Sequence, residues 1–232
     1  MKIINVRAGL LSRLPECAAT VALVVLINIS FVEEVEAQRS WVFNFALGDS
    51  YCFRTPLLIR QEGYDNIRIK ACYYTDSFSF PVYYSWKIGT SKDKRTFEIE
   101  LTHLKIYLEN KPQEIQHFAI SHGYNYFTLN YSHDAGFLIL RAGAGVIISH
   151  PENIVRNLEL DTHQGLFNRG YYFSGPGLQM AVEKRFSIYK GLFLSLEVKA
   201  AGAIAEVPVV DGKAIVPQAG LHGLFGLGYK FN

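Results

Sequence analysis

The feature that most constrains the fold of this chain is a regular alternation of apolar and polar residues after residue 40. It is clear in 97–102 (FEIELT), 194–199 (LSLEVK) and 221–231 (LHGLFGLGYKF). A repeat of two residues is typical of β-strands with one apolar and one polar face. The 14 Tyr, 16 Phe and 19 Gly of the 232 residues also favour pleated strands and tight turns. We therefore expect an all-β chain.

The alternating segments are long, and turn residues separate them. Several exceed the ~9–11 residues with which a tilted strand crosses a membrane. The segments from 66 to 231 form eight strands, and two earlier segments would raise the number to ten. We expect a closed antiparallel transmembrane β-barrel of 8 to 10 strands, with 38–65 as an N-terminal strand region and 66–232 as the barrel. The predicted strands are 41–47, 51–60, 66–75, 82–90, 95–109, 115–131, 136–149, 171–188, 191–205 and 214–231.

Residues 1–37 differ from the rest and have the pattern of a signal peptide. Basic residues precede an apolar run that ends near Val32, and Val35 and Ala37 are small enough for a cleavage site before Gln38. The run is shorter than the ~20 residues of a membrane anchor. A signal peptide followed by long amphipathic strands predicts export to a Gram-negative outer membrane.

The placement of charged residues separates a membrane barrel from a soluble one. A lipocalin-like periplasmic carrier would turn its apolar faces inward, whereas a membrane barrel turns them toward lipid. Charges are sparse on the predicted strands, which favours the membrane barrel with a polar lumen. The net charge of +2 does not indicate a nucleic-acid partner. The charged residues assigned to polar faces are Arg54, Arg60, Arg68, Lys70, Lys87, Arg141, Arg185, Lys199, Lys230, Glu98, Glu100, Glu183 and Glu197.

The end of the chain resembles the terminal strand of outer-membrane barrels. Phe225, Tyr229 and Phe231 have the aromatic spacing that the outer-membrane insertion machinery reads, although Asn232 displaces Phe231 from the last position. The resemblance implies that this machinery is a partner. We expect the barrel to be a monomer.

Two cysteines follow the predicted signal peptide. Cys52 and Cys72 are equidistant from Glu62, so a hairpin turning there would place them opposite each other. An even number of cysteines in an oxidising compartment favours a disulfide. The sequence therefore predicts a Cys52–Cys72 bridge.

One strand pair gathers residues suited to acyl transfer. Folding 95–109 onto 115–131 brings Glu98, Glu100 and His103 near Ser121 and His122. Serine, histidine and a carboxylate can activate a hydroxyl. Ser121 and His122 are adjacent on a predicted strand and so point to opposite faces, which favours a polar network that only stiffens the barrel.

Over most of its length after residue 37, the chain resembles the small outer-membrane barrels that include the lipid A 3-O-deacylase family. Activity in that family depends on a His-x-Ser pair with a glutamate on a neighbouring strand. This chain has 121–125 (SHGYN) instead. The resemblance therefore implies the barrel fold and outer-membrane lipid as a partner, and it transfers no catalytic residue.

The long segment 150–170 is the other candidate site. His150, Glu152, Arg156 and Arg169 could bind a lipopolysaccharide phosphate, an ion or a protein, or form an ordinary solvated loop. The sequence has no CxxC, HExxH or phosphate-binding loop, so we expect no metal and no cofactor. We expect a structural or binding role in the envelope. The alternatives are a lipid A acyl hydrolase and a soluble periplasmic carrier.

Overall fold

The computed structural model describes residues 39–231, and the predicted signal peptide lies outside them. Within this range no helix is long and apolar enough to cross a membrane. The described chain consists of strands, turns and loops. Its strands are β1 (Ser40–Cys52), β2 (Thr55–Gln61), β3 (Ile67–Ala71), β4 (Tyr73–Tyr74), β5 (Tyr84–Lys92), β6 (Arg95–His103), β7 (Ile106–Leu108), β8 (Ile115–Ile120), β9 (Tyr124–Asp134), β10 (Ile139–Ser149), β11 (Glu152–Val155), β12 (Leu158–Glu159), β13 (Tyr172–Tyr189), β14 (Leu192–Val209) and β15 (Gly212–Phe231).

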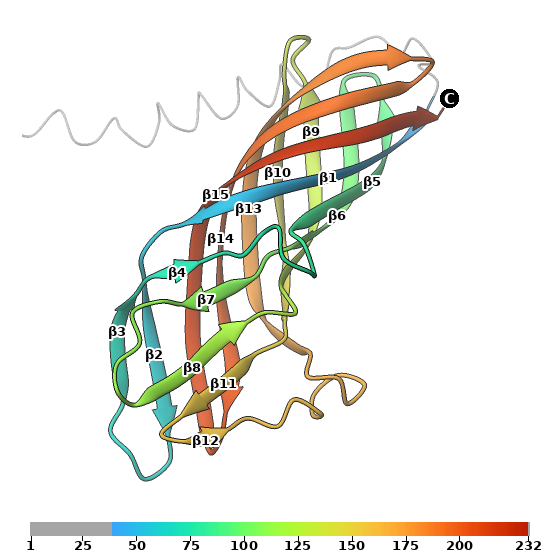
Figure 1. Ribbon diagram of the computed structural model, residues 1–232. Coiled ribbons are helices and arrows are strands. Elements are labelled where there is room, and N and C mark those ends of the chain that lie inside the picture. Colours follow the sequence, from blue (N-terminus) through green and yellow to red (C-terminus); the bar gives the residue numbers. More distant parts are fainter. Residues whose placement is uncertain (1–38, 232) are drawn as a thin grey trace, which may run out of the picture. The chain divides into compact units, whose positions relative to one another are not determined.

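Eight of these strands form a ring, which confirms the predicted all-β antiparallel barrel. The order is β1-β5-β6-β9-β10-β13-β14-β15, and β1 also pairs with β15 to complete the ring (Figure 1). The turns after β5, β9 and β13 are short and lie at one end, called here the short-turn end. The connections after β6, β10 and β14 lie at the other end. The first two of these are long, and we call this the long-loop end.

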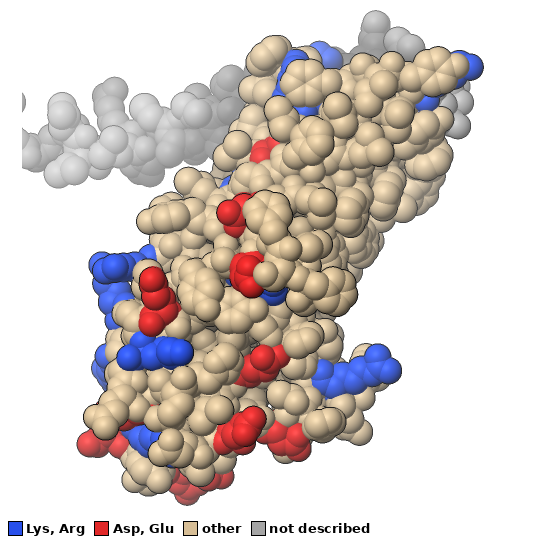
Figure 2. All heavy atoms as spheres, in the orientation of Figure 1, with Lys and Arg blue, Asp and Glu red and all other residues tan. Residues whose placement is uncertain are grey.

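The outer face of the ring carries an apolar belt. On β15 the outward residues from Leu221 to Phe231 are apolar and 38–56% exposed where they carry large side chains, whereas His222 and Leu224 point inward. Ten residues of strand rise about 34 Å, or roughly 25 Å at a tilt of about 40°, which matches the apolar band of outer-membrane barrels. Figure 2 shows Lys and Arg at the rim of the short-turn end and few charges below it. The soluble-carrier alternative is wrong because the apolar side chains point outward.

A second sheet builds an extension at the long-loop end. Its order is β12-β11-β8-β7-β4, and the β2–β3 hairpin adds to the end of β15 beyond the point where β1 leaves it. Side chains from both sheets share one apolar core, among them Leu57, Val207 and Val216 from the ring side and Ile106 and Phe118 from the second sheet. The molecule therefore has a lipid-facing ring and a cap that packs like a soluble domain.

The structure divides the early strands differently from the sequence interpretation. The eighth place in the ring belongs to β1, which lies in the region assigned to 38–65, whereas 67–74 forms β3 and β4 outside the ring. The predicted strand 115–131 is two strands, β8 and β9, which belong to different sheets. Gly123 lies between them with a φ of +125°, a conformation that L-residues rarely adopt and that breaks the strand.

The predicted disulfide is wrong. Cys52 and Cys72 are both free thiols. The β2–β3 register pairs Thr55 with Ala71, and Cys52 instead ends β1 opposite Gly220. Because Cys52 belongs to the ring and Cys72 to the end of the hairpin, the symmetry around Glu62 has no structural counterpart.

Candidate functional site

The interior of the ring is occupied by a network of buried charges centred on Arg141. This guanidinium binds three carboxylates: Nε lies 2.7 Å from Glu98, and the two terminal nitrogens lie 2.5 Å from Glu183 and Glu197. Each of these side chains is at most 2% exposed. Buried charge is tolerated only when it is paired in this way.

Two lysines and a second arginine complete the network. Lys87 binds Glu197, Lys199 binds Glu100, and Arg185 Nε lies 2.5 Å from Glu183. Four cations thus face four carboxylates, which confirms that the charges assigned to these ring positions pair inside a narrow lumen. An eight-stranded ring is just wide enough for its interior to be filled by such side chains.

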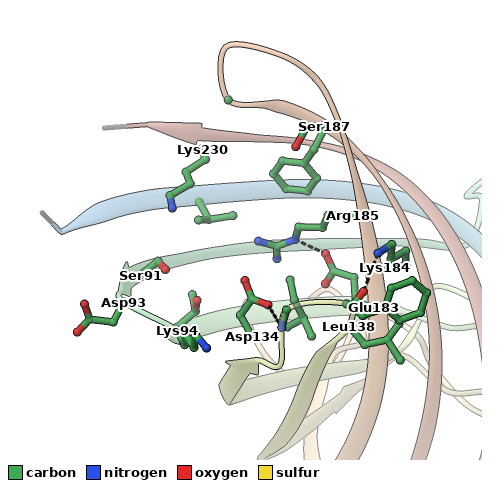
Figure 3. A pocket seen from close by; sticks show the side chains of 17 residues that line it. Ser91, Asp93, Lys94, Asp134, Leu138, Glu183, Lys184, Arg185, Ser187 and Lys230 are labelled. Carbon is green, nitrogen blue, oxygen red and sulfur yellow. Dashed lines mark hydrogen bonds and ion pairs between the residues drawn. The ribbon is translucent and has the colours of Figure 1, made fainter. Parts of the chain in front are cut away.

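At the short-turn end this network borders a hollow of about 320 Å³ (Figure 3). Arg185 reaches from the hollow to Glu183, and Lys184 Nζ donates 2.8 Å to the carbonyl oxygen of Phe137. Both polar groups are therefore engaged by the protein itself. This hollow is the mouth of the closed interior.

The predicted catalytic residues separate into two places. Glu98 and Glu100 belong to the lumen network, where Ser132 and Ser85 donate to them at 2.6 Å. Ser121 and His122 lie at the long-loop end, between β8 and β9. The carboxylate beside them is Glu152 of β11, which the sequence analysis had placed in a different candidate site.

Ser121, His122 and Glu152 form a compact group. Ser121 Oγ donates to Glu152 Oε1 at 2.5 Å, and His122 Nδ1 lies 2.7 Å from the same oxygen. His122 Nδ1 is also 3.1 Å from Ser121 Oγ. In an acyl-transfer triad the histidine uses one ring nitrogen for the serine and the other for the acid. Here one nitrogen serves both, so the geometry is not that of a triad.

His103, the remaining catalytic candidate, has another partner. Its Nδ1 lies 2.8 Å from Asn125 Oδ1, and its ring stacks on Tyr84 at 5.1 Å. It lines the same open hollow as His122, with a volume of about 350 Å³. Within residues 39–231 no hydrogen bond joins it to Ser121, so His103 lines that hollow without belonging to the Ser121–His122 group.

His150 completes the group at the long-loop end. Its side chain is 11% exposed, and its ring lies 4.8 Å from that of His122. Burial and the neighbouring His122 hold the pKa of His150 below its usual value. Burial raises the pKa of the Glu152 carboxyl, but hydrogen bonds from Ser121 and His122 outweigh it and the pKa is lowered.

The two loop arginines play different parts. Arg156 donates to Gln61 Oε1 at 2.6 Å and to the carbonyl oxygen of Asp65 at 2.7 Å, and it lies over the Tyr64 ring. It therefore fastens the β11–β12 hairpin to the β2–β3 hairpin. Arg169 is exposed in the loop before β13.

A second surface was misassigned by the sequence analysis. Arg54, Arg60, Arg68 and Lys70 were assigned with the lumen charges, but they are exposed on the outside, Arg60 on β2, Arg68 and Lys70 on β3 and Arg54 directly before β2. We call these four residues the cationic face. Within residues 39–231 none of them has a carboxylate within ion-pair distance. Figure 2 shows blue atoms gathered where Figure 1 labels β2 and β3.

The register explains this placement. Pro56 pairs with Lys70 and Leu58 with Arg68, so the outward residues of the two strands lie side by side. Together they line a groove of about 740 Å³ whose apolar part includes Pro56, Leu58 and Ile69. The alternation correctly placed these residues on one face, but it could not tell that the interior beside the hairpin is an apolar core, which takes Leu57 and Ile59 and leaves the charged face outside. The pairing of β2 with β15, a non-local contact, decides the side.

An eight-stranded antiparallel ring with an apolar belt outside and paired charges inside defines an outer-membrane β-barrel protein. The chain is therefore localised to the outer membrane, and the long-loop end corresponds to the end that faces the cell exterior in such barrels.

No protein-family model and no curated protein matches the sequence. Similar solved structures include Ail, the attachment invasion locus protein of Yersinia pestis, at 11% identity and a TM-score of 0.38, covering 85% of this chain and 100% of Ail. The outer membrane protein AlkL in lipid bilayers has 14% identity and a TM-score of 0.44, covering 87% and 94% of the two chains. Ail in complex with the heparin analogue sucrose octasulfate is similar at 11% identity and a TM-score of 0.35, covering 85% of this chain and 100% of Ail. The likeness concerns the fold alone.

Proposed function

We propose that this protein is a lipopolysaccharide-binding barrel of the envelope, and that the cationic face holds the phosphate groups of the lipid. The observation that carries the proposal is the set of four exposed, unpaired cations on adjacent strands. Arginine and lysine bind phosphate through charge-assisted hydrogen bonds. The closed lumen supports a binding role over transport, since the interior offers no path for a solute.

The position of the cationic face suits an outer-leaflet lipid. Arg54 follows directly after Phe53, whose amide donates to the carbonyl oxygen of Ala219, two residues beyond the end of the apolar belt at Leu221. Arg60 lies further out, opposite Lys213 of β15. The cations thus begin close to the edge of the belt and extend away from it. A phosphorylated headgroup anchored in the membrane beside the ring could reach them while its acyl chains remain in contact with the belt.

The groove adds apolar contact to the charge. Pro56 and Leu58 lie between the cations on β2, so an amphipathic ligand meets both kinds of surface. A protein that needed only to protect the edge strand β3 from pairing would require charge on β3 alone. Arg54, just before β2, and Arg60 on β2 extend the charge to a strand that is paired on both sides.

Binding of lipopolysaccharide to the purified protein in a zwitterionic detergent tests this proposal. The variant R54Q/R60Q/R68Q/K70Q should bind at least tenfold more weakly than the unaltered protein, and dephosphorylated lipopolysaccharide should bind both weakly. The matched control is K92Q/R95Q/K190Q/K230Q, which removes four exposed cations at the short-turn end. Equal binding by the two quadruple variants would contradict the proposal. The heat-dependent gel mobility of folded barrels reports whether each variant is folded.

A further inference from the structure

We propose that His122, His150 and Glu152 form a binding site for a divalent transition-metal ion of the Zn²⁺ class. We call these residues the histidine–glutamate cluster. Their ligand atoms all lie within 4.8 Å of one another. They come from two parts of the chain: His122 lies between β8 and β9, whereas His150 follows β10 and Glu152 begins β11. The site is distinct from the cationic face and does not depend on the function proposed for it.

Two of the three separations between the ligand atoms are close to those around a small tetrahedral ion. Metal–ligand bonds of about 2.0–2.1 Å place neighbouring ligand atoms about 3.3 Å apart in a tetrahedron. Glu152 Oε1 lies 2.7 Å from His122 Nδ1 and 3.7 Å from His150 Nδ1, values on either side of that length. Two imidazoles and one carboxylate favour Zn²⁺ and its neighbours over Ca²⁺ or Mg²⁺, which prefer oxygen ligands.

His150 supplies an independent sign of a missing ligand. Its Nδ1 is buried and has no hydrogen-bond partner in the described structure, and this nitrogen is the one that faces Glu152. An unpaired buried polar atom is destabilising. A bound ion would engage this lone pair, whereas a simple His122–Glu152 ion pair leaves it unused.

The surroundings hold the ring of His150 in one orientation. Its Nε2 edge lies against Gly170, where a Cβ would come within 2.5 Å, and Gly170 has a φ of +71°. Tyr171 packs edge-on against the ring at 4.9 Å. Nδ1 is therefore held on the side of the ring that faces Glu152. Such orientation of the metal-binding histidine is typical of built metal sites.

Ser121 and the adjacent hollow supply the remaining features. Ser121 donates to Glu152 Oε1, so it orients the carboxylate while one lone pair of that oxygen stays available. On binding, His122 takes the tautomer that carries its proton on Nε2, so Nδ1 offers its lone pair to the metal. The cluster opens on a hollow of about 500 Å³ that His117 and Thr162 also line. Water can therefore fill the fourth position, and His122, with a side chain 56% exposed, is reachable by ions from the exterior.

The sequence analysis expected no metal because no metal-binding motif is present. His122 and the pair His150 and Glu152 are separated by a whole hairpin, β9–β10, and the pairing of β8 with β11 brings them together. Glu152 itself pairs with Ala119. A site of this kind has no short spacing to recognise.

Titration of the untagged, chelator-treated protein in detergent with Co²⁺ and Zn²⁺ tests the proposal. We expect one equivalent of Co²⁺ to bind with the visible absorption of a four-coordinate ion, Zn²⁺ to displace it, and the unfolding temperature to rise with Zn²⁺. The variants H122Q, H150Q and E152Q should each weaken binding at least tenfold. H163Q is the matched control, because His163 lies in the same region with a side chain 89% exposed.

Two results would overturn the proposal. One is the absence of stoichiometric Co²⁺ binding by the unaltered protein. The other is binding by H122Q and E152Q that equals binding by H163Q. H122Q changes an exposed side chain, so it remains informative even if the loss of the buried His150 ring prevents folding. Lipopolysaccharide binding by the same variants keeps this outcome separate from that of the cationic face.

Discussion

The lumen of the ring and the outer surface of the long-loop end use the same residue types in opposite ways. Inside, Arg141 contacts three carboxylates and every cation of the network is paired. Outside, the four residues of the cationic face have no carboxylate within ion-pair distance in the described chain, and His150 has a buried nitrogen without a partner.

The difference indicates where the molecule can bind. A charge whose partners are all within the protein contributes to the structure and is not available to a ligand. Separating such an ion pair would leave a buried charge without a partner. A charge that meets only water exchanges that water for a ligand at little cost. Both of the sites proposed above accordingly lie at the long-loop end, outside the network of paired lumen charges.

We expect the largest loss of stability when the ion-pair network in the lumen loses its central cation. Arg141→Met leaves Glu98, Glu183 and Glu197 without their shared partner, so we expect the free energy of unfolding to fall by about 3–5 kcal/mol. Urea titration of the folded barrel in lipid vesicles, followed by tryptophan fluorescence, measures the loss.

The same substitution on the cationic face is its control. Arg60→Met removes an exposed cation without a carboxylate partner, and we expect a change within about 0.5 kcal/mol. Losses of similar size in the two variants would show that the distinction between lumen and surface is mistaken.

Salt sharpens the comparison. Lipopolysaccharide binding at the exposed cationic face should weaken several-fold between low salt and about 0.5 M, because mobile ions screen exposed charges. The unfolding midpoint of the protein should change far less, since the lumen network is excluded from solvent. Binding that is insensitive to salt would mean that apolar contacts, and not the four cations, hold the lipid.

Much of the barrel could be predicted from local pattern alone. The alternation in 221–231 correctly identified which side chains of β15 face lipid. The alternation in the other ring strands likewise placed Glu98, Arg141 and Lys199 in the lumen. These properties follow from the alternation within one strand, because successive side chains point to opposite faces of the sheet.

The errors concern non-local pairing. The alternation of 54–60 does not reveal that β2 adds to β15 rather than to β1, so the cationic face was misplaced and the disulfide wrongly inferred. The carboxylate of the Ser121–His122 group was sought on β6, whereas β11 supplies it through its pairing with β8. Both positions depend on contacts between segments far apart in sequence, which period and spacing do not encode.

A smaller loss of stability tests whether Gly170 holds the ring of His150 in place. Gly170→Ala places a methyl group within 2.5 Å of His150 Nε2, so we expect a loss of about 1–3 kcal/mol from backbone strain and displacement of the ring. Metal binding should weaken as well. Gly63→Ala is the control, because Gly63 also has a positive φ but no atom lies within 4 Å of its added Cβ. If both variants lose the same stability, the contact with His150 contributes nothing beyond strain.

The smallest effect concerns the two thiols. Cys52 is 8% exposed, whereas Cys72 is half-buried and its Sγ donates to Glu109 Oε2 at 3.1 Å. A maleimide should therefore label Cys72 in the folded protein and Cys52 only after unfolding. Because no bridge links the β2–β3 hairpin to β1, dithiothreitol should shift the free energy of unfolding by less than about 0.5 kcal/mol, whereas loss of a native disulfide costs about 2–5 kcal/mol. A larger shift would mean that a covalent link holds the hairpin against the ring. The cationic face would then owe its position to that link and not to the β2–β15 pairing.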